Sequence, residues 1–301
     1  MKRNKELGVI GANSMVGSRF CELSELQLVK ADLNGEISVD ITEQESVENF
    51  FQDNKFETVI LFSAFTDVDS AEGQRGNKSG TCWRVNVAGA KNVVEACRHF
   101  KRKLIFISTD FVFDGENGPY SETDLVGPNL EKVSWYGITK IEGEKLINNS
   151  LDDFMIIRIS YPYRSRFGSK ADFAKQILQR YDNHDLYPLF ADQQITPTFI
   201  DDLAPCISLL LSKNAGGIYN LASPEPVSPY EFGIELIRIF GYDPHYIERG
   251  KLKTLLKKPG MTPRPLRGGM KTDKIEKLGF KPTDWKNGIR EIFRQSNGRL
   301  I

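Results

Sequence analysis

The first half of the 301-residue chain alternates short apolar runs with longer amphipathic stretches. The apolar runs are rich in Val, Ile and Phe, as in parallel strands that are buried on both faces. Such alternation predicts right-handed crossovers and an α/β fold with a Rossmann-type doubly wound parallel sheet. The predicted strands are Leu7–Ile10, Gln27–Ala31, Thr58–Phe62, Leu104–Ser108 and Phe154–Ile159, and the predicted helices are Val16–Leu26, Glu43–Asp53, Trp83–Phe100 and Tyr136–Asn149.

The pattern changes after Ser160, where a polar and aromatic connector, YPYRSRFGSK, begins. The following elements are a predicted helix at Ala171–Tyr181, a strand at Ile218–Leu221, a helix at Pro229–Phe240 and a loop rich in Pro and Gly between Lys257 and Gly269. We therefore expect a smaller C-terminal substrate lobe beside the sheet. The expected division is a dinucleotide-binding domain over residues 1–160, to which 191–215 returns, and a substrate lobe over 161–190 and 216–301.

Charge and cysteine content argue against several classes of function. The 40 basic residues balance the 40 acidic residues, so no global field favours nucleic acid or an anionic membrane. Four scattered cysteines and three histidines give little support to a metal site or a disulfide framework. No apolar run reaches membrane-spanning length, and Leu7–Ile10 is too short for a signal-peptide core. We expect a cytoplasmic protein without a metal, a nucleic-acid partner or a membrane anchor.

The first candidate site is the turn GANSMVG at the end of the first apolar run. Gly11 and Gly17 allow a tight bend before a helix whose N-terminus can bind phosphate. A G-x-x-G-x-x-G spacing would need glycine where Ser14 stands. Asp32, at the end of the second run, could accept a hydrogen bond from an adenosine ribose. The alternative is an ordinary strand-to-helix turn with a surface aspartate.

Two further segments could act on a carbonyl group. Tyr136 and Lys140 are four residues apart, so on a helix they share one face, and an ammonium beside a phenol favours the phenolate. A phenol tuned in this way is a workable general acid. Ser108, Thr109 and Asp110 end the fourth apolar run, where a hydroxyl could bind the carbonyl oxygen. The alternatives are an exposed Tyr–Lys pair and a polar strand cap.

An ordered series of motifs then extends over nearly the whole chain: AFTDVDSAE, WRVNVAG, STDFVFDGENGPYSETD, WYGITKIEGE, ADQQITPTFIDDLA and TPRPLRGGMKTDKI. The series resembles the extended short-chain dehydrogenase/reductases, and within them the dTDP-4-dehydrorhamnose reductase family. The resemblance implies hydride transfer from NADPH or NADH to C4 of a nucleotide-linked 4-keto-6-deoxy sugar, without a metal.

The resemblance also implies roles for individual residues. Tyr136 would be the proton donor, Lys140 would bind the nicotinamide ribose, and Thr109, with Ser108 beside it, would orient the substrate carbonyl. The implied cofactor-binding residues are Gly11, Asn13, Ser14, Met15, Val16, Gly17, Asp32, Asp40, Ile41, Ser63, Ala64, Thr66, Asn86 and Lys140. The implied substrate-binding residues are Val68, Asp69, Phe111, Tyr161 and Arg267.

The chain departs from the family pattern at four places: Ser14, the longer spacer NLEKVSW before Tyr136, Tyr161 where a Trp is usual, and Ile195 where a Gly is usual. The last three fall on the expected substrate side and leave the base and the sugar open. Two other functions therefore stay open, a sister epimerase, dehydratase or reductase, and a non-catalytic regulatory subunit that keeps the fold. Asp32 favours NADH, although Lys30 and Arg19 could offset it. The oligomeric state does not follow from the sequence, and a homodimer is one option.

Overall fold

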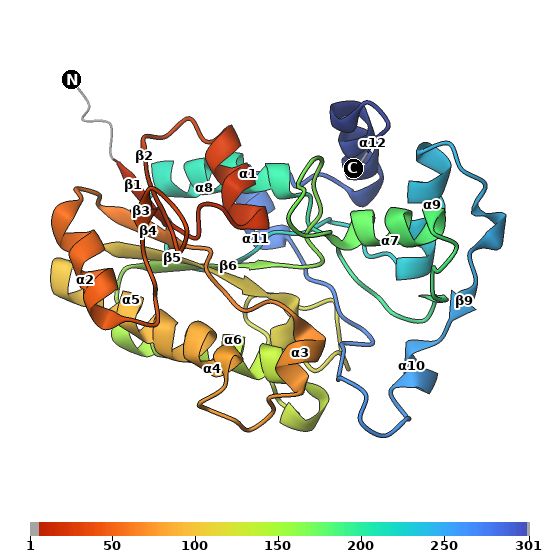
Figure 1. Ribbon diagram of the computed structural model, residues 1–301, viewed down its shortest axis with the longest axis horizontal. Helices are drawn as coiled ribbons and strands as arrows, with labels where there is room; N and C mark the ends of the chain where they lie inside the picture. The colour runs from red at the N-terminus through yellow and green to blue at the C-terminus, as the bar shows by residue number, and fades with distance from the viewer. Residues whose placement is uncertain (1–5, 300–301) are drawn as a thin grey trace.

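A computed structural model describes residues 6–299 and contains a seven-stranded sheet in which all strands are parallel (Figure 1). The strand order is β3-β2-β1-β4-β5-β6-β8. This arrangement confirms the predicted doubly wound sheet. The strands are β1 (Leu7–Ile10), β2 (Leu28–Asp32), β3 (Ile37–Ser38), β4 (Thr58–Leu61), β5 (Lys103–Thr109), β6 (Phe154–Ile159) and β8 (Gly217–Asn220).

Helices cover both faces of this sheet (Figure 1). One face packs on Phe20, Ile207 and Ile275, which come from α1 (Met15–Leu23), α8 (Leu203–Ser212) and α11 (Asp273–Lys277). The other face packs on α2 (Gln44–Asp53), α5 (Ala90–Phe100) and α6 (Trp135–Ser150). Because both faces are buried, the central strands are apolar over most of their length, which is the pattern seen in the sequence.

A smaller lobe lies at one end of the sheet and has a core of its own. Ile177, Phe232 and Ile289 meet there, from α7 (Phe173–Asp182), α9 (Pro229–Ile239) and α12 (Trp285–Ser296). Its remaining elements are the strand pair β7 (Leu189–Phe190) and β9 (Arg249–Gly250), followed by α10 (Leu252–Leu255). Strand β8 pairs with β6, and α11 packs on the sheet, so these two elements belong to the dinucleotide-binding domain and not to the substrate lobe expected over 216–301. The rest of the division into two domains stays a proposal.

The predicted helix at Trp83–Phe100 is built from three parts. A turn of α-helix, α4 (Thr81–Trp83), leads into a π-helical turn at Arg84–Gly89, and α5 follows. A Cβ atom on Gly89 would lie 2.8 Å from Cγ1 of Ile41, so the close approach of these two segments depends on glycine. Turns of π-helix often occur at functional sites, and this one carries Asn86. Helices α8 and α12 are additional to the predicted elements.

The position of a ligand site follows from the topology. The strand order reverses between β1 and β4, and ligands of doubly wound sheets bind beyond the carboxyl ends of the strands at such a point. The chain leaves β1 at Gly11 and leaves β4 before Ser63, so both residues lie there. None of the helices within residues 6–299 is both long enough and apolar enough to cross a membrane.

Candidate active site

The turn after β1 requires glycine at two positions. Gly11 has a φ of +87°, and a Cβ on it would lie 2.5 Å from the Ser63 backbone nitrogen. A Cβ on Gly17 would lie 2.2 Å from the Gly11 carbonyl oxygen. Both contacts are too short for any side chain, so the two glycines let the first turn of α1 pack directly against the end of β1. Asn13, Met15 and Val16 complete this turn.

Ser14 caps α1 and carries no backbone strain. Its φ of −65° is ordinary for any residue, so this position does not need the glycine that the G-x-x-G-x-x-G spacing would place there. The hydroxyl accepts a hydrogen bond from the Gly17 N–H at 3.1 Å and donates one to the Gly11 carbonyl at 2.7 Å. The hydroxyl proton is therefore used within the turn. The phosphate donors of this cradle are backbone N–H groups at the N-terminus of α1.

Asp32 joins the end of β2 to the cradle. Its carboxylate accepts a hydrogen bond from the Asn13 N–H at 2.9 Å, which places it where the ribose of a dinucleotide is expected. Arg19 does not stand ready for a 2′-phosphate, because its guanidinium binds both carboxylate oxygens of Asp201 at 2.6 Å. Lys30 is exposed on β2. The immediate surroundings of Asp32 thus favour a ribose hydroxyl over a phosphate.

The resemblance places Asp40 and Ile41 near the adenine, but both side chains make contacts within the protein. The Asp40 carboxylate accepts hydrogen bonds from the N–H and the hydroxyl of Thr42, both at 2.8 Å. Ile41 is only 4% exposed and packs in the core beside the sheet. A direct side-chain contact between Ile41 and a cofactor is therefore not supported by this structure.

The loop after β4 is held from behind by the buried side chain of Asn86. Its amide oxygen accepts from the Phe65 N–H at 2.8 Å, and its amide nitrogen donates to the Phe65 carbonyl and to the Thr139 hydroxyl, both at 3.0 Å. The amide thus fixes the loop that carries Ser63, Ala64 and Thr66. Asn86 is a positioning residue in this structure, whereas the resemblance placed it among the cofactor contacts.

Tyr136 and Lys140 lie on successive turns of α6, and both are buried. Burial raises the pKa of Tyr136, and a hydrogen bond with the Thr109 side chain lowers that pKa in part. Burial also lowers the pKa of Lys140 to about 7, with a smaller opposing effect of the Glu144 carboxylate. The expected lowering of the Tyr136 pKa by the ammonium is therefore wrong for the ligand-free chain, because burial dominates both groups.

The Lys140 ammonium faces an aromatic ring and is left with unused donors. It lies 3.9 Å from the centre of the Phe106 ring, and none of its hydrogen atoms is donated to an acceptor within the part of the chain that the structure describes. A buried ammonium without hydrogen bonds is costly. Ribose hydroxyls of a bound nicotinamide nucleotide would supply the missing acceptors.

The two adjacent hydroxyls at the end of β5 have different surroundings. Thr109 is within hydrogen-bonding reach of Tyr136 and accepts from the Phe111 N–H at 3.2 Å. Ser108 instead donates to the Glu144 carboxylate at 2.6 Å. Glu144 is in turn bound by Arg158 through two hydrogen bonds. Thr109 is therefore the hydroxyl within reach of Tyr136, whereas Ser108 supports Glu144, one helical turn beyond Lys140.

Aromatic side chains extend from Tyr136 toward the smaller lobe. The Phe111 ring lies 6.1 Å from the Tyr136 ring and 5.9 Å from the Tyr161 ring, and Tyr161 continues to Phe173 at 5.1 Å. Gln193 donates to the Tyr161 hydroxyl at 3.0 Å and fixes its position. Flat rings in such a row can stack on a nucleotide base or pack against a sugar.

Helix α3 (Val68–Glu72) contacts the Pro- and Gly-rich loop between Lys257 and Gly269. Arg264 donates to both carboxylate oxygens of Asp69 at 2.8 Å. Arg267, the residue expected to bind substrate, is exposed, and its described contacts are made by its backbone. Of these two arginines, Arg264 is thus the one whose side chain is tied to α3, and the substrate-binding role of Arg267 stays a prediction. The sequence signal for Arg264 is the segment TPRPLR, which contains both arginines.

Asp110 is a second residue that the sequence noted without assigning it to the site. Its side chain is 2% exposed and accepts a hydrogen bond from the Ser160 hydroxyl at 2.8 Å. Burial raises the pKa of this carboxyl group to about 6, against the opposing effects of Ser160 and Thr109. Asp110 thus places a weakly acidic group beside Thr109, at the junction of β5 and β6.

Two of the departures from the family pattern have structural explanations. The long spacer is held against α3 and the residues that follow it. The Trp135 backbone N–H donates to the Glu72 carboxylate at 2.8 Å, and the Arg75 guanidinium donates to the Val133 carbonyl at 2.6 Å. Ile195 is 1% exposed in the core of the smaller lobe, and its backbone pairs with Val227. It therefore acts on the packing of the lobe and does not contact the site.

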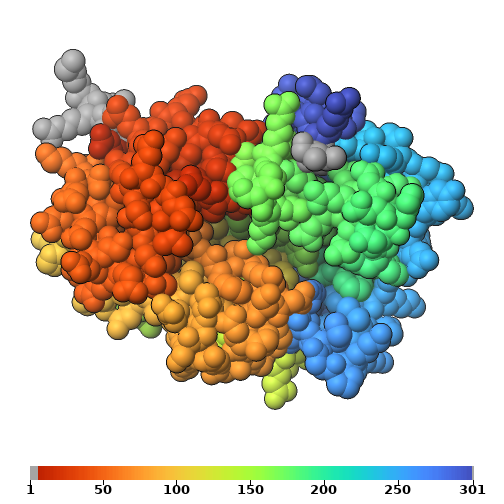
Figure 2. All heavy atoms as spheres, viewed as in Figure 1, coloured from red at the N-terminus to blue at the C-terminus, as the bar shows by residue number. Residues whose placement is uncertain are grey.

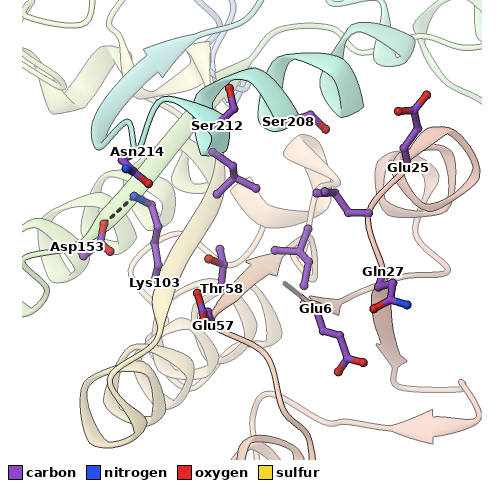
Figure 3. Close-up of a pocket in the computed structure, with 13 residues that line it drawn as sticks. Glu6, Glu25, Gln27, Glu57, Thr58, Lys103, Asp153, Ser208, Ser212 and Asn214 are labelled. Carbon is purple, nitrogen blue, oxygen red and sulfur yellow. Dashed lines mark hydrogen bonds and ion pairs between the residues drawn. The ribbon is translucent and has the colours of Figure 1, made fainter. Parts of the chain in front are cut away.

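A separate pocket of about 590 Å³ lies at the amino edge of the sheet (Figure 3). Glu6, Glu25 and Glu57 line it, together with the ion pair between Lys103 and Asp153. None of the predicted site residues is among its thirteen lining residues. Because doubly wound sheets bind ligands at the carboxyl edge, we place the active site at that edge and not in this pocket.

The described residues contain no group of three or more His, Cys, Asp or Glu side chains arranged to hold a metal ion. Residues 5–297 match the protein family described as the RmlD substrate binding domain. The chain belongs to this family. The resemblance to dTDP-4-dehydrorhamnose reductases that its motifs indicated is thereby confirmed.

Individual relatives agree with this assignment. The probable low-salt glycan biosynthesis reductase Agl14 of Haloferax volcanii is 31% identical over 75% of this chain and 73% of its own length. A dTDP-4-dehydrorhamnose reductase of Aggregatibacter actinomycetemcomitans is 27% identical over 94% of this chain and 97% of its own. The fold is also that of a Bacillus anthracis dTDP-4-dehydrorhamnose reductase solved with NADP, with a TM-score of 0.85, 24% identity, and coverage of 97% of this chain and 99% of that one.

Proposed function

We propose that the protein is an NAD(P)H-dependent reductase that reduces the C4 carbonyl of a nucleotide-linked 4-keto-6-deoxy sugar to an alcohol. The two dTDP-4-dehydrorhamnose reductases named above carry such a substrate in their names, and one of them was solved with NADP. The cradle would hold the pyrophosphate of a reduced nicotinamide dinucleotide, which would supply the hydride. The cradle fits such a cofactor, because Gly11 and Gly17 leave no room for side chains beside the N-terminus of α1.

The residues of the chain then have distinct tasks. Thr109 donates a hydrogen bond to the carbonyl oxygen and places it beside Tyr136. Burial raises the pKa of Tyr136, so the phenol is protonated at neutral pH and can deliver its proton to the developing alkoxide. Lys140 donates to the ribose hydroxyls, and its positive charge stabilises the phenolate that remains.

One observation carries this proposal: Thr109, Tyr136 and Lys140 converge beyond the carboxyl end of β5, within one fold that also provides the phosphate cradle. The test is to mix the purified protein with NADH or NADPH and a panel of nucleotide 4-keto sugars, starting with dTDP-4-keto-6-deoxy-L-mannose. The proposal predicts loss of absorbance of the reduced nicotinamide. Tight cofactor binding without turnover of any member of the panel would instead favour a regulatory subunit.

A sister activity of the same superfamily, such as an epimerase or a dehydratase, would leave the cofactor unchanged over a full cycle. Consumption of one NADH or NADPH per sugar converted therefore distinguishes a reductase from an epimerase and from a dehydratase. Action in the cytoplasm and assembly as a homodimer remain predictions, which cell fractionation and sedimentation velocity can test.

A further inference from the structure

One stretch of the smaller lobe carries a dense positive charge. From Arg249 to Lys271 the chain has eight basic residues and no acidic residue. The other residues of the chain therefore include 32 basic and 40 acidic ones, a net charge of −8. The balanced total charge thus conceals a strongly uneven distribution. We call residues 249–271 the basic segment.

The charges of the basic segment are largely left without acidic partners. Within residues 6–299, Arg264 is the one cation of the segment that forms an ion pair, and its partner is Asp69. Lys251, Lys253, Lys257 and Lys258 are all exposed on α10 and the turn that follows it. The Asp192 carboxylate lies nearby and accepts from the backbone N–H groups of Leu252 and Lys253, but none of these four ammonium groups forms an ion pair within the described residues. Their field therefore extends into the solvent.

Three contacts fix the basic segment at the mouth of the active site. The Asp192 carboxylate accepts from the Leu252 N–H at 2.7 Å and so anchors the start of α10. Gln193 donates both to the Pro265 carbonyl and to the Tyr161 hydroxyl at 3.0 Å, which joins the segment to the aromatic row. Arg264 reaches across to Asp69 on α3. In Figure 2 the blue surface of α10 and its loop accordingly meets the orange surface of the other half at the lower edge.

We propose that the exposed lysines of the basic segment attract the diphosphate group of the nucleotide-sugar substrate and so speed its association with the protein. This inference rests on the proposed function. A diphosphate carries two or more negative charges, so the field of the exposed ammonium groups acts on it before any contact is made. Arg264 is paired with Asp69 at 2.8 Å, so it contributes less to this field than the exposed lysines do.

Electrostatic steering can be recognised from association kinetics. Charges near the site raise the association rate constant by about 10- to 10³-fold, and this increase disappears as ionic strength rises. Charges far from the site should not have this effect. The test compares K251Q/K253Q/K257Q with a control, K55Q/K101Q/K213Q, that removes the same charge. The three control lysines are exposed and precede β4, β5 and β8, so they lie at the opposite edge of the sheet.

The measurement is the association rate of dTDP, with UDP and GDP as further probes, followed by stopped-flow tryptophan fluorescence of the NADH-loaded protein at several salt concentrations. Trp135 packs in one cluster with Tyr136 and provides the signal. We expect K251Q/K253Q/K257Q to slow association about tenfold at low salt and to flatten its dependence on salt. The control triple variant should behave as the wild-type protein.

Each other outcome contradicts the proposal. Equal effects of the two triple variants would show that only total charge matters. Wild-type rates in K251Q/K253Q/K257Q, in a protein that turns over 4-keto sugar nucleotides, would overturn steering and leave the proposed function intact. Loss of oligonucleotide binding in that variant, with unchanged nucleotide association, would assign the segment to nucleic acid. A wild-type protein that neither binds these nucleotides nor reduces their 4-keto sugars would overturn both proposals.

Discussion

The Ser108 hydroxyl donates a 2.6 Å hydrogen bond to the Glu144 carboxylate, so it points away from the phenol of Tyr136. Glu144 lies one helical turn beyond Lys140 and two turns beyond Tyr136, and Arg158 binds both of its oxygens. The neighbouring hydroxyl of Thr109 is the one within reach of Tyr136. Two residues that look equivalent in the motif STD therefore have separate tasks.

Substitution of each hydroxyl separately should reveal this division. We expect T109V to lower kcat by about 10²-fold, since one hydrogen-bond donor to the developing oxyanion is lost. We expect S108A to keep kcat within a few-fold of wild type but to lower the free energy of unfolding by about 1–3 kcal/mol, because a buried carboxylate loses a donor. Steady-state kinetics and urea denaturation measure the two effects. The reverse pattern, an active T109V and an inactive but stable S108A, would show that the assignment is wrong.

Removal of the phenol hydroxyl tests the proton donor. Y136F should reduce turnover by about 10²- to 10⁴-fold, which is the usual contribution of a positioned general acid. The affinity for NADH should stay near the wild-type value, because the cradle at Gly11 and Gly17 is unchanged. Titration by nicotinamide fluorescence measures this affinity directly. A Y136F protein that retains normal turnover would exclude Tyr136 as the donor.

Lys140 should reduce the stability of the ligand-free protein while it supports function. Burial lowers its pKa from 10.5 to about 7, so between these pH values the unfolded chain holds a proton that the folded chain lacks. The contribution of this group to the free energy of unfolding therefore rises with pH across that window. K140M should remove this rise, stabilise the chain by about 1–2 kcal/mol near pH 7, and abolish turnover.

The matched control for that experiment is K145M, since Lys145 lies on the same helix with its side chain exposed. Unfolding curves at pH 6, 8 and 10 should differ between wild type and K140M, and coincide for wild type and K145M after a constant offset. Equal pH dependence in all three proteins would contradict the buried, weakly basic lysine.

The surroundings of Asp32 predict a preference for NADH over NADPH. The carboxylate repels a 2′-phosphate, and Arg19 is held by Asp201 instead of facing the ribose. D32N should raise the affinity for NADPH about tenfold, or by about 1.4 kcal/mol, and weaken NADH binding. Equilibrium titration of both cofactors measures this change, with D53N at the other edge of the sheet as the control. Unchanged NADPH affinity in D32N would show that another group sets the preference.

The parts of this fold that follow from local sequence were predictable, and the long-range pairings were not. Apolar runs identified five strands, of which β1, β4, β5 and β6 are buried over most of their length, whereas β2 is only partly buried. The spacing of Tyr136 and Lys140 placed them on one helix face, as the structure shows. The direction of the Ser108 hydroxyl depends on Glu144 and Arg158, which are distant in the sequence, so no local pattern could have revealed it.

Two further points depend on the folded structure. Arg264 and Arg267 lie in one C-terminal segment, and the structure shows a side-chain contact with Asp69 for Arg264, whereas the substrate-binding role expected of Arg267 stays a prediction. The pKa shifts of Tyr136 and Lys140 depend on burial, which spacing along a helix does not report. Ser14 seemed to interrupt the glycine pattern, but in the structure it is the N-cap of α1 with ordinary dihedral angles.

The central claim is that hydride moves from the nicotinamide to C4 of a nucleotide-linked 4-keto sugar while Tyr136 provides the proton. The most direct measurement uses NADH that carries deuterium at both C4 positions, with NMR and mass analysis of the sugar product. We predict one deuterium per product molecule, bound to C4 of the sugar, and at least about 10²-fold slower formation of this product by Y136F. A product without deuterium, or with deuterium at another carbon, would contradict this account.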